Sequence, residues 1–451
     1  MTNLWHIRNM LKSLRVQYCL IFLLFFTIEI SSVYALQLDT LSVLLQHHFQ
    51  IADLQSLEAA PFTSWIYLHI QPPLFNGLVA IFSFINGKVY TDLVVLNCLC
   101  AALTSLIILH IVNQFAGQQK WLAYMAAIIY LLAPSTLLYA AYPFYPVLTS
   151  VGYAALGLSF FTNKNHKTFS LVLLTVSVIY LTLLRSSFPP AIAFVVIGIY
   201  FFLIDDHIAW KRNAILVTVC SLAPITAVYT KNLIMYDFWG STSFASLNIL
   251  KGFDIPVQPN YFPTPEQIKN DRLDLACEHS YSTIDQMLFK QDGGPNYNSC
   301  YWLAFAQSHQ GLVWQQYEFT PHAKRVAAHL ARYYSLPDKY QYVSNRVNIS
   351  KYADSFNVIF LPLSIREGYT LRISIFLLML LMPWVLYRNP DRRIIGLYAI
   401  IALHMTSHVL TDGDESDRFV FDIEFCFYIF TAYVCSRLIQ KSREEPNLYG
   451  A

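Results

Sequence analysis

The stretch YLHIQPPLFNGLVAIFSFIN, residues 67–86, decides how the rest of the chain is arranged. Its apolar part, residues 74–85, is only 12 residues long, whereas a helix needs about 20 apolar residues to cross the hydrocarbon core of a bilayer. A run of this length is more typical of a helix that lies at the membrane interface. Pro72 and Pro73 lack a backbone donor and disfavour helix in the residue before them, so they indicate a break in the chain just ahead of this helix.

The chain as a whole is too apolar for a soluble protein. Of its 451 residues 55% are hydrophobic and 13% are charged, and the mean hydropathy is +0.41, whereas a soluble domain carries about 25% charged residues. Apolar runs recur between short polar strings, which predicts an all-α polytopic membrane protein. The net charge of +2 gives no indication of a nucleic-acid partner.

Ten longer runs are predicted to span the membrane. They cover residues 16–36, 92–113, 121–138, 145–162, 168–185, 188–204, 213–231, 370–387, 394–410 and 419–436. The first run also fits a secretory signal with Val33-Tyr34-Ala35 at the cleavage site, but its length and the many later runs favour a transmembrane helix.

The excess of basic residues in cytoplasmic loops decides whether residues 74–85 also cross. If they do not cross, the basic N-terminus and every basic link lie on one side of the membrane. Those links contain Lys120, Lys164, Lys211, Arg392 and Arg437. If residues 74–85 do cross, all of these links move to the outside. We therefore predict ten spans with both termini in the cytoplasm.

Five segments are then predicted on the outer face: 37–91, 133–146, 185–190, 232–369 and 411–418. The long segment 232–369 has the composition of an ordered outer domain, and it separates an N-terminal transmembrane part, residues 1–231, from a C-terminal part, residues 370–451. Within it, the stretches 263–277 and 321–336 predict amphipathic helices that begin with proline. In an oxidising compartment Cys277 and Cys300, both in this segment, can form a disulfide.

Several carboxylates are predicted on or near the outer face. Asp39 follows the first span and begins a short amphipathic helix, where it either caps that helix or has a chemical role. Asp53 and Glu58 belong to the same outer segment, with a solvated loop as the alternative. Glu424 lies inside the last span, where an ionisable side chain is a functional candidate, the alternative being an ion pair with a nearby arginine.

Three cations lie where spans meet the outer surface: Arg185, Lys231 and Arg418. Each can extend to the lipid headgroups on its own. If they face one cleft, they form a site for a lipid phosphate or diphosphate. His404 and His408 share one face of a helix at i, i+4, but the sequence offers no third ligand, so no metal site is predicted there.

A carboxylate beside a lipid-phosphate site suits the transfer of a group from a lipid carrier. The carboxylate takes the proton of an acceptor hydroxyl, and the cations stabilise the phosphate as it leaves. Four elements of the sequence resemble the GT-C superfamily of membrane glycosyltransferases, among them the protein O-mannosyltransferases and the lipid A aminoarabinose transferases. They are Asp39, HIQPPLF (69–75), APSTLLYAAYPFYP (133–146) and GDESDRFVFDIEF (413–425).

The resemblance implies a GT-C-like bundle of about ten transmembrane helices, with interfacial helices in the first outer loop and one large outer-face domain. It implies that Asp39 is the general base and Arg418 a ligand of the donor phosphate; Arg185 and Lys231 join the phosphate site on the predicted topology. Further site candidates are His69, Gln71, Asp53, Glu58, Glu415 and Glu424. Because Thr40 follows Asp39 where the mannosyltransferases carry a second acidic residue, a protein acceptor is not implied.

The expected activity is an inverting transfer of a sugar from an undecaprenyl or dolichyl phosphate to a glycan, lipid or protein acceptor at the outer face. The bacterial inner membrane is favoured as the location, and the endoplasmic reticulum remains open. A divalent metal near Asp39 is compatible with this chemistry, although no ligand cluster requires one. A transporter or flippase of lipid-linked saccharides is one alternative, which predicts internal repeats and broken helices. An inactive subunit that keeps the fold is another.

Overall fold

The computed structural model describes most of the helical part of the chain. The described residues are 14–38, 50–162, 166–204, 210–244, 262–278, 287–291, 293–310, 348, 351–352, 355, 370–411 and 416–444. Asp39, Glu415 and the predicted helix at 321–336 lie outside them, and so does the side chain of Arg418.

Helices dominate the described residues, and these contain no β-strand, only an isolated bridge between Phe289 and Pro295. The helices are α2 (Leu14–Ala35), α4 (Leu54–Ala59), α5 (Pro61–Ile66), α6 (Pro73–Asn86), α7 (Val89–Phe115), α8 (Lys120–Leu131), α9 (Pro134–Ala141), α10 (Pro146–Thr162), α11 (Lys167–Leu184), α12 (Pro190–Leu203), α13 (Trp210–Tyr236), α15 (Pro265–Asn270), α16 (Leu273–Cys277), α17 (Cys300–Gln310), α21 (Thr370–Arg388), α22 (Arg392–Thr411) and α23 (Ser416–Glu444).

A helix or a helix pair occupies each of the ten predicted spans. Four helices, α2, α7, α11 and α13, are long and apolar enough to cross a membrane, and a fifth span is formed if α8 and α9 count as one bent pair. The prediction of an all-α membrane protein is confirmed at this level. The number of ten spans stays a prediction, because α10 and α12 are apolar but shorter.

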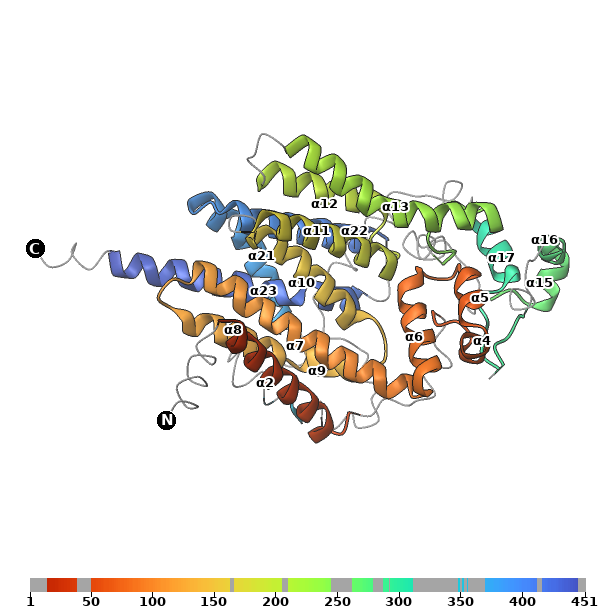
Figure 1. Ribbon diagram of the computed structural model, residues 1–451, viewed down its shortest axis with the longest axis horizontal. Coiled ribbons are helices and arrows are strands. Elements are labelled where there is room, and N and C mark those ends of the chain that lie inside the picture. The colour runs from red at the N-terminus through yellow and green to blue at the C-terminus, as the bar shows by residue number, and fades with distance from the viewer. Residues whose placement is uncertain are drawn as a thin grey trace, which may run out of the picture.

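The long helices run side by side along the longest axis of the molecule (Figure 1). Helix α10 lies at the centre and packs against α7, α11 and α23. Its Gly152 permits the close approach of α11, because a Cβ atom there would lie 2.8 Å from Cδ2 of Leu181 and 2.8 Å from Cδ1 of Tyr180. Small residues of this kind are typical of close helix contacts in membrane proteins.

Helix α6 begins at Pro73, as the Pro-Pro pair predicted, with Pro72 in an extended conformation (φ −54°, ψ 147°). One face of the helix is buried and includes Phe75 and Val79. The opposite face is also apolar but exposed, with Phe84 76% exposed. An apolar face without a protein partner among the described residues suits contact with lipid.

The predicted span over residues 121–138 is not one straight helix. Helix α8 ends at Leu131, α9 begins at Pro134, and the two are bent by 47°. The cause is Pro134, which disfavours helix in the residue before it, and Ala133 is accordingly extended (φ −62°, ψ 137°). The stretch 133–146, predicted as an outer loop, is therefore largely a buried helix.

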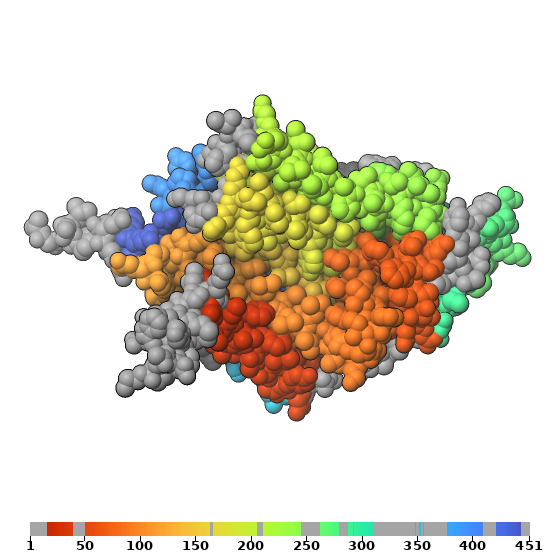
Figure 2. Space-filling model, in the orientation of Figure 1, coloured from red at the N-terminus to blue at the C-terminus, as the bar shows by residue number. Residues whose placement is uncertain are grey.

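The connections between helices gather at two ends of the bundle. Among the described residues, contacts join 50–72, 142–145, 185–188, 231–244 and 293–310 at what we term the loop end. In the space-filling view the surface of α13, in yellow-green, meets that of α5 and α6, in orange-red, at this end (Figure 2). Residues 114–120, 389–393 and 433–441 meet at the opposite end, termed the basic end.

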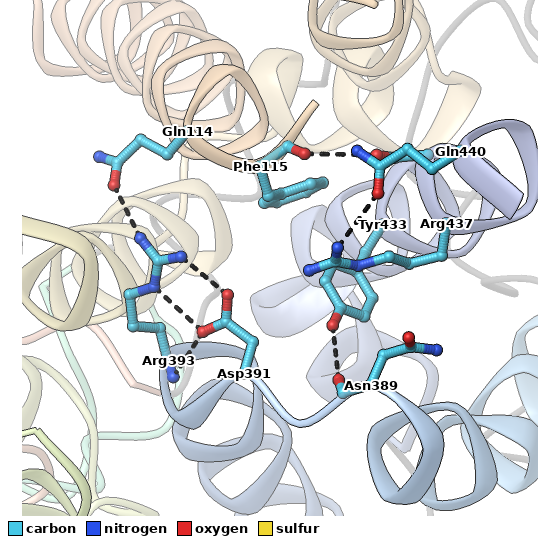
Figure 3. A network of polar contacts seen from close by, with 9 residues as sticks. Gln114, Phe115, Asn389, Asp391, Arg393, Tyr433, Arg437 and Gln440 are labelled. Carbon is cyan, nitrogen blue, oxygen red and sulfur yellow. Dashed lines mark hydrogen bonds and ion pairs between the residues drawn. The ribbon is translucent and has the colours of Figure 1, made fainter. Parts of the chain in front are cut away.

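A network of polar contacts joins the helices at the basic end (Figure 3). Arg393 binds both carboxylate oxygens of Asp391, at 3.0 and 2.7 Å, and donates to Gln114 of α7 at 3.3 Å. Burial acts to raise the pKa of Asp391, but the hydrogen bonds and charge of Arg393 outweigh it and lower that pKa. The hydroxyl of Tyr433 donates to the carbonyl of Asn389 at 2.8 Å, which links α23 to the end of α21.

Candidate functional site

A chain of contacts at the loop end joins the first outer segment to the last helix. The hydroxyl of Tyr145 donates to Oε1 of Gln50 at 2.9 Å. The guanidinium of Arg185 lies over the ring of Tyr145, with Cζ 4.9 Å from the ring centroid. Nη2 of Arg185 binds Oδ2 of Asp422 in α23 at 2.7 Å. Four segments that are distant in sequence therefore meet around one arginine.

The pair of Arg185 and Asp422 is buried, with side chains 1% and 0% exposed. Burying two charges is costly, and the cost is recovered only when they pair closely and find further partners. The position of Arg185 helps, because it directly follows the last residue of α11, where the helix dipole favours a cation. Arg185 does not extend to the surface, so a phosphate would have to share it with Asp422.

Asp422 was not among the residues selected from the sequence. The signal was present, because Asp422 stands two residues before Glu424 in the same helix and the rule that selected Glu424 applies to it equally. Asp422 makes the kind of contact considered for Glu424, an ion pair with arginine. Glu424 accepts hydrogen bonds from the hydroxyls of Ser135 at 2.7 Å and Tyr428 at 3.2 Å.

His69 fastens the Pro-Pro string to the segment beyond α13. Its side chain is fully buried, and Nδ1 lies 2.9 Å from the hydroxyl of Ser243. Its backbone N–H donates to Asn298 at 2.8 Å, and its carbonyl accepts from the N–H of Ser243 at 2.8 Å. Burial, with a smaller contribution from the charge of Lys231, lowers the pKa of His69 to about 3. His69 is therefore neutral at physiological pH.

Lys231, in α13, contacts the backbone just before His69. Its ammonium group donates to the carbonyl of Ile66, the last residue of α5, at 3.0 Å and to that of Leu68 at 2.5 Å. Arg185 and Lys231, predicted to share a phosphate site, thus have different partners. Lys231 binds backbone near the Pro-Pro string, while Arg185 binds Asp422.

The remaining candidates of the first outer segment differ in environment. Asp53 is 5% exposed rather than solvated, and it caps α4 by accepting from the N–H and the hydroxyl of Ser56 at 3.0 and 2.6 Å. Gln71 is 5% exposed, and its Oε1 has no hydrogen-bond partner in the described part of the chain. Glu58 is exposed.

Glu29 is a second buried carboxylate that the sequence reading did not select. It lies in α2 with 0% exposure, and neither oxygen has a hydrogen-bond partner among the described residues. An intramembrane carboxylate of this kind marks a candidate functional position.

The outer segment is covalently fastened by a disulfide. Cys277, at the end of α16, is bonded to Cys300, at the start of α17, with a Cα–Cα distance of 5.5 Å. The disulfide allowed by the sequence is present. The predicted amphipathic helix at 263–277 is also present as α15 and α16, and Thr264 forms a capping box with Gln267 at its start.

Arg418 belongs to the first turn of α23 and precedes Asp422 by one helical turn. Asp39 lies eleven residues before Gln50, the first described residue of the outer segment. The contact chain runs from Gln50 through Tyr145 and Arg185 to Asp422. In sequence, Asp39 lies near its first residue and Arg418 lies near its last. The resemblance implies that these two residues are the general base and the phosphate ligand.

Composition and the described helices together define an all-α membrane protein. Comparison with protein-family models, curated proteins and solved structures finds no match for the chain.

Proposed function

We propose that the chain is an integral membrane glycosyltransferase that transfers a sugar from a polyprenyl phosphate to an acceptor at the outer face. The observation that carries the proposal is the contact chain Gln50–Tyr145–Arg185–Asp422. It fastens the segment that contains Asp39 to the helix that contains Arg418. A base and a phosphate ligand must lie on the two sides of one reacting carbon, and this chain supports such proximity.

In the proposed reaction Asp39 removes the proton of an acceptor hydroxyl. The acceptor oxygen bonds to the anomeric carbon of the sugar as the bond from that carbon to the phosphate oxygen breaks. A single displacement of this kind inverts the configuration at the anomeric carbon. Arg418 stabilises the negative charge that remains on the lipid phosphate, as preorganised cations do at developing anions.

The proposal includes ten spans, cytoplasmic termini and an outer-face site, most readily in a bacterial inner membrane. The division of the connections into two ends supports this topology. Described parts of the segments predicted outside meet at the loop end, and the residues around Gln114 and Arg393 meet at the basic end. The exposed apolar face of α6 supports an interfacial position for that helix.

One observation favours a second candidate, a flippase or transporter of lipid-linked saccharides. Transporters commonly use broken helices at their substrate sites, and α8 and α9 form a pair bent by 47°. The two candidates differ in outcome, because the enzyme breaks the bond between sugar and phosphate, whereas a flippase leaves the donor intact.

The test is donor binding by purified protein in detergent, measured as a thermal shift. Polyprenyl-phosphate mannose, glucose and aminoarabinose are compared with free polyprenyl phosphate and with polyprenol. A phosphate site predicts a rise in the melting midpoint with the phosphate lipids but not with polyprenol, and a loss of most of that rise in Arg418→Ala.

Arg392→Ala, which removes a cation at the basic end, is the matched control and should retain the shift. A donor that stabilises Arg418→Ala as much as wild type would remove Arg418 from the site. The absence of a shift with every phosphate lipid would contradict the proposal itself.

A further inference from the structure

Three buried side chains, His404 and His408 of α22 and Asp422 of α23, form a cluster that the proposed transfer does not use. One ligand atom from each residue lies within 4.8 Å of the others, and the side chains are 2%, 1% and 0% exposed. The two histidines are one helical turn apart and so share a face of α22. The folded chain supplies the third ligand that the sequence did not offer.

We propose that this cluster binds one divalent transition-metal ion, with Zn²⁺ the best fit. Two imidazoles and one carboxylate form a donor set that zinc accepts in tetrahedral sites, with a fourth position for water or another oxygen ligand. Magnesium and calcium prefer oxygen ligands, so two histidines disfavour them. The proposal does not depend on glycosyl transfer.

The spacing of the cluster is compatible with a bound ion. Metal–ligand bonds of about 2.0–2.2 Å place tetrahedral ligands roughly 3.3 Å apart. The ligand atoms here lie up to 4.8 Å apart. Closing that gap requires rotation of the His404 and His408 side chains, whose rings are in contact with a centroid distance of 4.4 Å.

The surroundings provide the outer contacts that metal ligands use. The hydroxyl of Tyr153 lies 2.8 Å from Nδ1 of His404, and in the proposed site Nε2 of His404 binds the ion. Such a partner fixes the tautomer and the orientation of a metal-bound imidazole. Oδ2 of Asp422 pairs with Arg185 at 2.7 Å, and in the proposed site Oδ1 binds the metal.

Arg185 also sets a limit on affinity. Its positive charge repels a cation close to Asp422. We therefore expect weaker binding than in a zinc site whose carboxylate has only neutral partners. A bound ion would link α22 to α23 next to Arg185.

The experiment uses full-length protein purified without a polyhistidine tag, stripped with a chelator, loaded with Zn²⁺ and desalted before its metal content is measured. We expect about one zinc ion per chain in wild type, and at least roughly tenfold weaker binding in His408→Gln and His404→Gln, because a ligand is lost. Tyr153→Phe should weaken binding by about tenfold, because only an outer contact is lost. His166→Gln, which changes an exposed histidine at the start of α11, is the control and should bind as wild type does.

A second readout is the visible absorption of Co²⁺ in the same preparations, which reports tetrahedral nitrogen and oxygen coordination and should disappear in His408→Gln. The proposal is overturned if loaded wild type retains no zinc, or if His408→Gln retains as much as wild type. Both outcomes can be read even if a variant of Asp422 fails to fold.

Discussion

Arg185 makes several contacts that its position in the sequence does not predict. It follows the last residue of α11, lies over the ring of Tyr145 and pairs with Asp422, all out of contact with solvent. In a low-dielectric bundle such a pair is strong only while both members are present. Loss of either member alone would therefore destabilise the loop end, whether or not Arg185 also contacts substrate.

Removal of one member of this pair should be more harmful than removal of both. We expect Arg185→Met or Asp422→Leu alone to lower the free energy of unfolding by about 3–5 kcal/mol, because each leaves an uncompensated buried charge. The double variant should recover much of the loss. The check is a double-mutant cycle measured by denaturant unfolding in detergent, and additive losses would show that the two side chains do not interact.

The neutral His69 gives the protein a defined response to acid. Its pKa is lowered to about 3 in the folded state by burial, while an unfolded histidine titrates near its ordinary value of 6.5. Between these two values the unfolded chain takes up a proton that the folded chain does not. Stability is thus fully present above about pH 6.5 and falls with pH by up to roughly 1.4 kcal/mol per unit until the folded pKa is reached.

In His69→Gln the dependence of the unfolding midpoint on pH between 7 and 4 should be shallower than in wild type, since that proton is no longer taken up. His166→Gln alters an exposed histidine and serves as the control, with the wild-type slope expected. If His69→Gln and wild type show the same slope, His69 takes up a proton in the folded protein as readily as in the unfolded chain. The assignment of a neutral, buried His69 would then be wrong.

At the scale of elements, proline is the residue whose effects were foreseen in one place and missed in another. Pro73 begins α6 as the short apolar run predicted. Pro134 ends α8 by the same mechanism, yet the apolar run over residues 121–138 conceals the break, because hydropathy does not change across it. The capping role of Asp53 was also missed, because the N–H of Ser56 needs a cap only when α4 begins at Leu54.

The disulfide should stabilise the short helices of the outer segment. Cys277 and Cys300 close a loop with a sequence separation of 23 residues. Loss of the bond should lower the stability of this segment by about 3 kcal/mol, mainly because the unfolded chain gains freedom. We expect Cys277→Ser/Cys300→Ser to be cleaved faster by protease near α15–α17, with Cys220→Ser, an unpaired cysteine, as the unaffected control. Equal cleavage in all three proteins would contradict this.

For the molecule as a whole, the sidedness that the basic residues predict remains to be tested, and the packing of distant helices defines contacts that the sequence did not predict. The basic residues Arg393 and Arg437 lie near each other at the basic end (Figure 3), and the side of the membrane on which they lie stays a prediction. The partners of Arg185 and of His404 could not be foreseen, since Asp422 and Tyr153 reach them only through packing between distant helices. Sequence fixes which residues are ionisable, but not which of them neutralise each other.

The proposed topology can be tested at the two ends of α7. Lys88 precedes this helix, Lys120 follows it, and both are exposed. With Cys19 and Cys220 replaced by alanine, Lys88→Cys should react with a membrane-impermeant maleimide in intact cells, whereas Lys120→Cys should react only after permeabilisation. Equal reactivity in intact cells would mean that α7 does not cross, and the reverse pattern would place the loop end in the cytoplasm.

The most direct measurement of the central claim is the release of free polyprenyl phosphate from polyprenyl-phosphate sugars by protein in proteoliposomes, with a membrane extract as the source of acceptor. This readout needs no knowledge of the acceptor, and it separates an enzyme from a flippase. We predict release by wild type with at least one sugar, and a loss of about 10²-fold or more in Asp39→Asn with the protein still folded, as expected when a general base is removed. No release with any donor, or release by Asp39→Asn within a few-fold of wild type, would contradict the account.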